Sequence, residues 1–279
     1  MKVAITGAKG MLASALIPLL KEHELISIDL PEVDITDKKA VEKGLAKADF
    51  VFHFAAFTDV DGAELAEKKV FDINEHGTEN IALVCKKLGI PLLYISTDYV
   101  FSNGKKTKPW AETDKPNIEA GVYARSKLAG EQAVQRHCQK YFIVRTAWLY
   151  GQHGLNFIDT ILKKAKETPE LKVVDDQKGT PTYTRHLARA LVKFLDIKEY
   201  GIYHLTNQGE TSWYGLAKKV FELSGNNIKI IPCRTEDFPR PAPRPKYAVL
   251  GNAHWLALGQ EPLPSWEEGV REYLKELKQ

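Results

Sequence analysis

The sequence has few cysteines and no arrangement of side chains that is typical of a metal site. Its three cysteines, Cys85, Cys138 and Cys233, are too few and too scattered for a disulfide framework, and none forms a Cys-x-x-Cys pair. The eight histidines form no His-Glu-x-x-His or comparable spacing. We therefore predict free thiols in a reducing compartment and no metal site built from these residues.

Long hydrophobic runs and a surplus of one charge are also missing. No stretch approaches the roughly 18 apolar residues of a membrane span, and the apolar run within residues 1–7 is too short for a signal peptide. The formal net charge is only +3, and Lys and Arg are interspersed with Asp and Glu. These absences argue against nucleic-acid and membrane partners, and we expect a globular protein of the cytoplasm.

Short apolar runs alternate with helical patterns through the first half of the chain. We expect strands at residues 3–6, 25–29, 50–54, 92–96 and 142–146, and helices at 11–21, 37–47, 74–87 and 122–139. Strands separated by helices of this length form parallel βαβ units, so the pattern predicts an α/β fold with a Rossmann-type doubly wound sheet.

From about Tyr150 onward, turns and prolines become more frequent. We expect helices at residues 183–195, 212–223 and 265–277, the last with Ser265 as its N-cap, and strands at 203–205 and 228–231. Residues 1–150 are thus predicted to form the first domain. Residues 151–279 are predicted to form mainly a smaller α/β lobe, from which some segments return to the first domain. The proline-rich stretch 232–245 carries three arginines and suits a flap over an anionic group better than an extended docking segment.

A glycine-rich loop follows the first predicted strand and opens the first helix. Gly7 permits a tight turn and Gly10 lets a pyrophosphate approach the backbone, while the helix N-terminus offers free N–H groups. The spacing is Gly-x-x-Gly-x-x-Ala, with Ala13 in the place of a third glycine. Asp29 closes the second strand, where a carboxylate can bond the adenosine ribose and would repel a 2′-phosphate. The loop predicts dinucleotide binding with NADH accepted; a solvated Asp29 is the alternative.

Tyr123 and Lys127 are four residues apart, so on a helix they share one face. A nearby ammonium lowers the pKa of a tyrosine, and the same Lys can donate to a nicotinamide ribose. Thr97 ends the preceding strand, where its hydroxyl can bond a substrate carbonyl. A plain amphipathic helix and a local cap are the alternatives. Together with the glycine loop, however, the three residues predict an NAD(P)-dependent oxidoreductase.

On these motifs the chain resembles the extended short-chain dehydrogenase/reductase family, and within it the dTDP-4-dehydrorhamnose reductase group. The resemblance covers nearly the whole chain, and its most specific strings are Ser-Thr-Asp-Tyr-Val-Phe at 96–101 and Asp-Gln-Lys-Gly-Thr-Pro-Thr at 176–182. The other matching segments are residues 5–12, 34–37, 58–64, 123–131, 145–151, 201–205 and 244–250.

The resemblance implies reduction of the C4 ketone of dTDP-4-dehydro-L-rhamnose to dTDP-L-rhamnose by NADH or NADPH, with Thr97, Tyr123 and Lys127 catalytic. The implied cofactor-binding residues are Gly7, Lys9, Gly10, Met11, Leu12, Asp29, Asp34, Ile35, Phe54, Ala55, Ala56, Thr58, Tyr123 and Lys127. The implied substrate-binding residues are Thr58, Val60, Thr97, Asp98, Tyr99, Tyr123, Trp148, Asn156, Gln177 and Arg244, the last toward the diphosphate. A homodimer or a monomer is implied, and magnesium by family analogy alone.

The chain departs from the usual pattern of the family at several positions. Ala13 and Ala124 replace glycines, Gly121 replaces an asparagine, Ala248 replaces a frequent serine, and residues 117–122 are slightly lengthened. None of these changes removes a catalytic group, but they leave the exact sugar open. Another nucleotide-sugar reductase or epimerase is one alternative. A non-catalytic regulatory subunit, like that of methionine adenosyltransferase, is the other, and the intact Thr97, Tyr123 and Lys127 argue against it.

Overall fold

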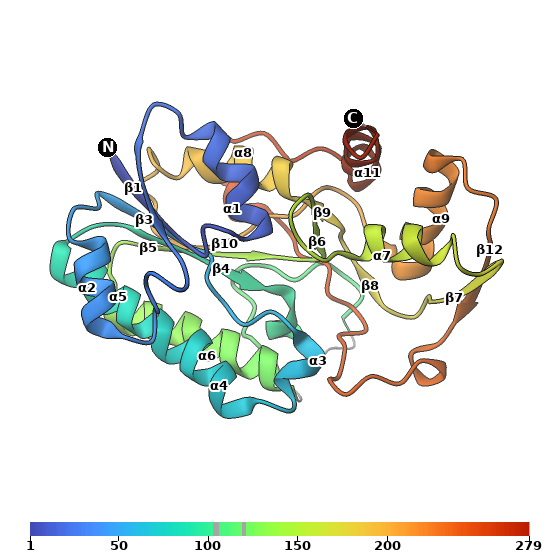
Figure 1. The fold of residues 1–279 in the computed structure, drawn as a ribbon, viewed down its shortest axis with the longest axis horizontal. Helices are drawn as coiled ribbons and strands as arrows, with labels where there is room; N and C mark the ends of the chain where they lie inside the picture. The colour runs from blue at the N-terminus through green and yellow to red at the C-terminus, as the bar shows by residue number, and fades with distance from the viewer. Residues whose placement is uncertain (103–105, 119–120, 279) are drawn as a thin grey trace.

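The computed structural model describes residues 1–102, 106–118 and 121–278. Its centre is a six-stranded parallel sheet with strand order β10-β5-β4-β3-β1-β2 (Figure 1). The strands are β1 (Lys2–Thr6), β2 (Glu24–Ile28), β3 (Phe50–His53), β4 (Leu92–Thr97), β5 (Tyr141–Thr146) and β10 (Gly201–His204). The chain leaves β1 toward β2 on one side and returns to β3 on the other, which creates a crevice at the carboxyl ends of these strands.

Helices cover both faces of the sheet, as Figure 1 shows. On one face, α1 (Met11–Leu16) and α8 (Thr184–Lys193) pack their leucines against the phenylalanines of β3 and β5. On the other face lie α2 (Lys38–Leu45), α5 (Thr78–Leu88) and α6 (Val122–His137). Both sides of each strand are therefore removed from water, which explains why the strands read as continuous apolar runs. The predicted doubly wound Rossmann-type fold is confirmed.

Two of the predicted helices are shorter or less regular than the sequence indicated. The first ends at Leu16 and continues as a 3-10 turn, η1 (Ile17–Leu19), because Pro18 has no N–H to donate and its ring resists an α-helical interior. The helix expected at 74–87 begins within a π-helical segment, η2 (Asp72–Gly77), before α5. There the buried Asn74 accepts from Phe57 N at 2.8 Å and donates to Ser126 Oγ at 2.9 Å, which ties the loop after β3 to α6.

Short elements follow β3 and β4 at the carboxyl edge of the sheet. They are α3 (Val60–Ala63), α4 (Glu67–Phe71) and the 3-10 helix η3 (Asp98–Phe101). Behind them Glu131 of α6 and Arg145 of β5 form a fully buried ion pair, with Arg145 Nη2 at 2.7 Å from Glu131 Oε2. Ser96 Oγ donates to Glu131 Oε1 at 2.6 Å. This network holds α6 against the ends of β4 and β5. It therefore fixes the rotation of α6 and the helix face that lines the crevice.

The second half of the chain contributes both to the sheet and to a lobe beside it. Strand β10 extends the sheet next to β5, and α8 covers it. The lobe has its own core of residues from α7 (Phe157–Lys164), α9 (Trp213–Ser224) and α11 (Trp266–Glu276), and it carries the parallel pair β7 (Glu170–Val174) and β12 (Lys229–Cys233). The remaining elements are β6 (Leu149–Tyr150), β8 (Lys178–Gly179), β9 (Thr182–Tyr183), β11 (Thr211–Ser212), η4 (Thr235–Asp237) and α10 (Ala253–Ala257). Ser265 caps α11 as predicted, since its Oγ accepts from Glu268 N at 3.1 Å.

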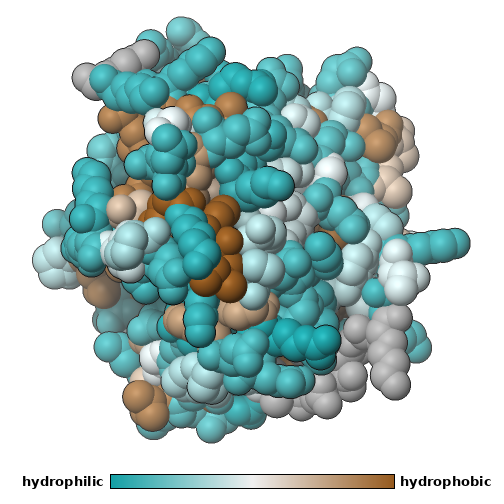
Figure 2. Space-filling model, turned by 90° about the vertical axis from the view of Figure 1, so that its right-hand side faces the viewer, coloured by the Kyte–Doolittle hydropathy of each residue, from teal (hydrophilic) through white to brown (hydrophobic). Residues whose placement is uncertain are grey.

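The outer face of this lobe is mostly polar. Figure 2 views the molecule from the side on which α9 and β12 lie, and hydrophilic residues cover most of it, with hydrophobic ones in one area left of the centre and in smaller patches. Among the described residues, no helix combines the length and the apolar character needed to cross a membrane.

Candidate active site

A cavity of about 830 Å³ opens at the carboxyl ends of β1, β3, β4 and β5. Every residue that the sequence predicted to bind cofactor lines it: Gly7, Lys9, Gly10, Met11, Leu12, Asp29, Asp34, Ile35, Phe54, Ala55, Ala56, Thr58, Tyr123 and Lys127. The lining also contains seven of the ten predicted substrate residues: Thr58, Val60, Thr97, Asp98, Tyr99, Tyr123 and Trp148. Segments far apart in the sequence thus converge on one crevice, as the topology of the sheet requires.

The glycine-rich loop is built for close backbone approach. Gly7 has φ +67°, and a Cβ placed there would lie 2.7 Å from the backbone nitrogen of Ala55, so no larger residue fits between β1 and the loop after β3. Gly10 precedes α1 without a side-chain cap, which leaves the first N–H groups of the helix for another partner. These features fit the pyrophosphate of a nicotinamide dinucleotide.

Asp29 follows β2 at the edge of the cavity, and both of its carboxylate oxygens accept hydrogen bonds. Its Oδ2 accepts from Lys9 N at 2.8 Å, and its Oδ1 accepts from Leu30 N at 2.8 Å. The Lys9 ammonium lies beside Glu32, with Nζ 3.3 Å from Oε2. The end of β2 therefore presents a carboxylate held by two backbone N–H groups, with the exposed ammonium of Lys9 close to Glu32.

Thr97 and Asp98 follow one another at the end of β4. Thr97 Oγ1 accepts from Tyr99 N at 3.2 Å and donates to Asp98 Oδ1 at 3.0 Å. Asp98 is only 2% exposed, and burial raises the pKa of its carboxyl to about 7. The hydroxyl predicted to bind a substrate carbonyl is therefore coupled to an acid that titrates near neutrality.

Tyr123 and Lys127 extend from α6 into the same cavity. The ring of Tyr123 meets that of Tyr99 edge-on, with centroids 5.5 Å apart. Lys127 Nζ donates to the carbonyl of Ile95 at 2.8 Å and lies 4.2 Å from the centre of the Tyr94 ring. Burial lowers the pKa of Lys127 to about 7, against the opposite effect of Glu131.

The predicted lowering of the Tyr123 pKa by Lys127 is wrong for this structure. Burial and the neighbouring Asp98 raise the pKa of Tyr123 to about 12, and the hydroxyl of Thr97 opposes this only in part. The ammonium of Lys127 is engaged by the Ile95 carbonyl instead. Tyr123 is therefore protonated at neutral pH, which is the form that a proton donor needs.

An aromatic wall closes the end of the cavity next to the lobe. Trp148, predicted as a substrate residue, has φ +46°, and its indole is stacked on that of Trp213 from the start of α9. Sequence analysis missed Trp213, as it missed the lining residues Lys69, Ile73, Thr146 and Leu155. Trp213 follows Ser212, the N-cap of α9. The sequence there indicates the start of a helix, but it does not indicate contact with Trp148, which lies 65 residues earlier.

Three of the predicted substrate residues lie outside the cavity lining. Asn156 is the N-cap of α7, where its Oδ1 accepts from Asp159 N at 3.0 Å and its amide donates to Gly151 O at 3.0 Å. Gln177 lies behind the wall, since its Oε1 accepts from Trp213 Nε1 at 3.0 Å. These contacts show structural partners for both side chains, and their contact with substrate stays a prediction.

Arg244, the third, belongs to the proline-rich stretch, which has no regular structure between η4 and Pro245. Arg244 Nη2 lies 2.9 Å from Asp61 Oδ1 and its guanidinium 6.0 Å from the centre of the Tyr99 ring. Arg240 also faces Asp61, at 3.5 Å. The stretch is therefore held against α3 at the edge of the site, as a flap would be, and the charge of Arg244 is matched by Asp61.

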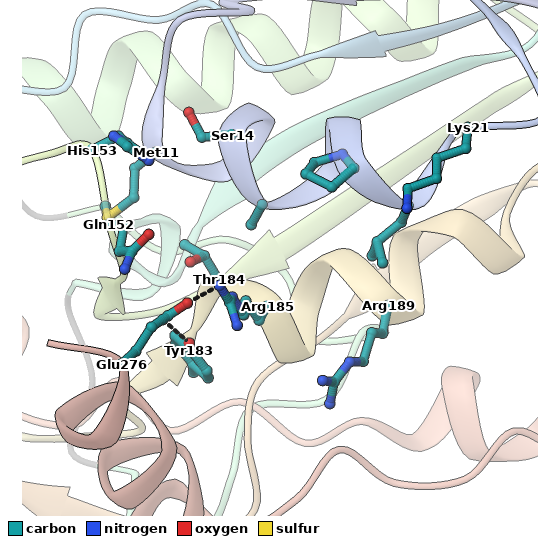
Figure 3. Close-up of a pocket in the computed structure, with 13 residues that line it drawn as sticks. Met11, Ser14, Lys21, Gln152, His153, Tyr183, Thr184, Arg185, Arg189 and Glu276 are labelled. Atoms are coloured by element: carbon teal, nitrogen blue, oxygen red, sulfur yellow. Dashed lines mark hydrogen bonds and ion pairs between the residues drawn. The ribbon is translucent and has the colours of Figure 1, made fainter. Parts of the chain in front are cut away.

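A second, smaller cavity of about 340 Å³ lies between α1 and α8, shown in Figure 3. Met11 lines both cavities. Arg185 is paired with Glu276, which also accepts from the hydroxyl of Tyr183, and His153 lies in the loop on the far side of Met11 (Figure 3). The charged side chains that line this second cavity are mostly cations.

Among the residues that the structure describes, no three His, Cys, Asp or Glu side chains come together as a metal site.

Comparison with known proteins agrees with this geometry. The whole chain, residues 1–279, matches the family described as the RmlD substrate binding domain. It is 40% identical over 279 residues to the spore coat polysaccharide biosynthesis protein SpsK of Bacillus subtilis, covering 99% of this chain and 97% of that protein. It superimposes on a dTDP-4-dehydrorhamnose reductase from Clostridium acetobutylicum with a TM-score of 0.97 at 42% identity, covering 100% of both chains. A dTDP-4-dehydrorhamnose reductase from Bacillus anthracis, solved in complex with NADP, gives a TM-score of 0.95 at 38% identity and covers 99% of each chain.

Proposed function

Because the chain belongs to the dTDP-4-dehydrorhamnose reductase family, we propose that it reduces the C4 ketone of dTDP-4-dehydro-L-rhamnose to dTDP-L-rhamnose. The observation that carries the proposal is the convergence of Thr97, Tyr123 and Lys127 on one cavity with the glycine-rich loop. A module that only binds a dinucleotide would have no use for a hydroxyl, a phenol and an ammonium at the carboxyl ends of the strands. The chain is accordingly an oxidoreductase rather than a regulatory subunit.

The residues of the chain divide the work of the reaction. NADH or NADPH, held by the loop at Gly7 and Gly10, supplies hydride when bound. Thr97 orients the carbonyl oxygen of the sugar, and Tyr123 delivers the proton that this oxygen needs as it becomes an alcohol. Lys127 lines the same cavity, where its ammonium would donate to the ribose next to the nicotinamide.

The residues assigned to the sugar nucleotide form part of the same proposal. Trp148 supplies a ring face for the sugar or the base, and Thr58, Val60 and Tyr99 line the cavity around the reacting end. Arg244 would meet the diphosphate by exchanging its partner Asp61 for the ligand. We also infer a cofactor-binding part within residues 1–150 and a mainly substrate-binding part within 151–279. We further propose that the enzyme is cytoplasmic and that it works as a homodimer or a monomer.

An absorbance assay of the reduced nicotinamide tests the reaction. Purified protein should oxidise NADH or NADPH when dTDP-4-dehydro-L-rhamnose is present, and should not do so with dTDP alone. NMR of the product distinguishes the rhamnose configuration at C4 from its epimer. No loss of reduced cofactor with this substrate would overturn the proposed activity, and the other epimer would overturn the proposed product.

A further inference from the structure

We propose that Asp98 acts as a neutral carboxylic acid that donates to the hydroxyl of Thr97, so that the Thr97 proton is free for the substrate's carbonyl oxygen. Asp98 would then be a residue that sets the direction of a hydrogen bond rather than one that transfers the reaction's proton. The inference rests on the proposed ketone reduction for its kinetic consequence, but the protonation of Asp98 can be tested without any substrate.

The surroundings of the two carboxyl oxygens differ. Oδ1 lies 3.0 Å from Thr97 Oγ1, whereas Oδ2 is buried and has no hydrogen-bond partner among the residues that the structure describes. No ion pair to Asp98 is found within the same residues. A buried carboxylate oxygen without a partner is costly while the group carries its charge, and protonation removes that charge. Asp98 is itself one of the residues that line the cavity.

The hydroxyl of Thr97 has one proton and two lone pairs to distribute. One lone pair accepts from Tyr99 N at 3.2 Å. If Asp98 is ionised it can only accept, so the single proton of Thr97 points to Asp98 and only a lone pair faces the cavity. A ketone oxygen is itself an acceptor, and this arrangement gives it no donor from Thr97. If Asp98 is neutral, its O–H donates to the second lone pair and the Thr97 proton can turn to the ketone.

The same protonation also affects Tyr123. The charge of Asp98 is one of the two causes that raise the pKa of Tyr123, and a hydrogen bond from Thr97 lowers it. A neutral Asp98 removes the effect of its charge, whereas the single Thr97 proton is then used for the ketone. Loss of the Asp98 charge makes Tyr123 a better proton donor to the alkoxide that forms at C4.

The groups around Asp98 leave it without a neutralising cation. Its neighbours include Tyr99 of η3 and Tyr123 of α6, and the charge of Asp98 raises the pKa of each of these phenols. Lys127 lines the same cavity, but the charge that affects its pKa is that of Glu131. Beyond Tyr99 lie the charged groups of Arg244 and Asp61, which are paired with each other. Burial outweighs the local hydrogen bonds and raises the pKa of Asp98 to about 7, so the carboxyl is divided between its neutral and ionised forms near neutral pH.

The kinetic test compares wild type with Asp98→Asn, whose amide can donate to Thr97 and never ionises. Between about pH 6 and about pH 8.5 we expect the kcat of wild type to fall further than that of Asp98→Asn, by about the thirtyfold that titration of Asp98 contributes; Lys127 titrates in both enzymes. In a Thr97→Val background, Asp98→Asn should change the pH profile no further, because the hydroxyl through which Asp98 acts is gone. An Asp98→Asn enzyme whose kcat falls as steeply as that of wild type would assign the whole alkaline fall to Lys127 or another group and overturn the proposal.

A spectroscopic test needs no turnover. The infrared difference spectrum of wild type minus Asp98→Asn at about pH 6 should contain the carbonyl stretch of a protonated carboxylic acid, and this band should vanish by about pH 9. Its absence at the lower pH would show that Asp98 is ionised and would refute the inference. If the band is present but no dTDP-sugar is reduced, the proposed function fails while the neutral state of Asp98 stands.

Discussion

The indole rings of Trp148 and Trp213 lie face to face, with centroids 3.5 Å apart and planes 7° apart. Trp148 follows β5 and Trp213 begins α9, so the contact joins the sheet to the lobe at the end of the cavity. The indole nitrogen of Trp213 is held by Gln177, and Gln177 in turn donates to Thr235 Oγ1 at 3.0 Å. Each ring is thus oriented by the other, and that of Trp213 also by the hydrogen bond to Gln177 behind it.

We expect the wall to set the affinity for the sugar nucleotide. Trp213→Leu should raise the KM for the dTDP-sugar by about tenfold and leave the KM for NADPH unchanged, because a stacked ring contributes on the order of 1 kcal/mol. Gln177→Leu should shift the same constant less. Tyr214→Leu, on the same helix but outside the cavity lining, is the matched control. An unchanged KM in the Trp213 variant would remove it from the site.

The phenol of Tyr123 should be required for turnover and not for cofactor binding. Tyr123→Phe is expected to lower kcat by about 10²- to 10⁴-fold, the usual contribution of a positioned proton donor. The Kd for NADH, followed by the fluorescence of the bound cofactor, should remain within about twofold of wild type. Tyr200→Phe, which removes a phenol packed against Phe142 outside the cavity, controls for the substitution itself. Equal turnover in Tyr123→Phe would exclude the acid role.

Although Lys127 is needed for the reaction, its burial should lower the free energy of unfolding at neutral pH. Its pKa is lowered from 10.5 to about 7 in the folded state. Between these values the unfolded chain holds a proton that the folded chain lacks, so the stability of wild type rises with pH by about 1.4 kcal/mol per unit. Below about pH 7 both states are protonated and this dependence disappears.

Replacement of Lys127 by Met removes that contribution. The unfolding free energy of Lys127→Met minus that of wild type should therefore decrease as the pH rises from about 7 to about 10, while activity is lost at every pH. Urea unfolding at several pH values measures the difference, and Lys140→Met at the surface is the control. A difference that does not vary with pH would contradict the lowered pKa.

The pair of charges at the end of β2 should set the preference between the two cofactors. Asp29→Asn should raise the ratio of kcat/KM for NADPH to that for NADH by about tenfold, because a negative charge beside the 2′-phosphate is removed. Lys9→Gln should lower the ratio, since it removes the neighbouring cation. Both ratios come from initial rates with each cofactor. Variants that change the two values of kcat/KM equally would show that neither residue meets the 2′ position.

What the sequence determined about this protein is local in origin. The alternation of apolar runs and helical patterns gave the parallel sheet, because strand and helix periodicities are written in neighbouring residues. The glycine loop and the spacing of Tyr123 and Lys127 were visible for the same reason, and all the predicted cofactor residues line one cavity. Ser265 as an N-cap needed only the residues that follow it.

What the tertiary structure decided depends on distance through space. Trp213 became a neighbour of Trp148 only when α9 packed beside the end of β5, and Asn156 and Gln177 found partners within the lobe instead of lining the cavity. The titration of the site is the clearest case. A motif predicts that an ammonium lowers the pKa of a tyrosine, but burial acts on Tyr123, Lys127 and Asp98 together and reverses the expected direction for Tyr123. Burial depends on the packing of the whole chain around each group, so no spacing in the sequence could reveal it.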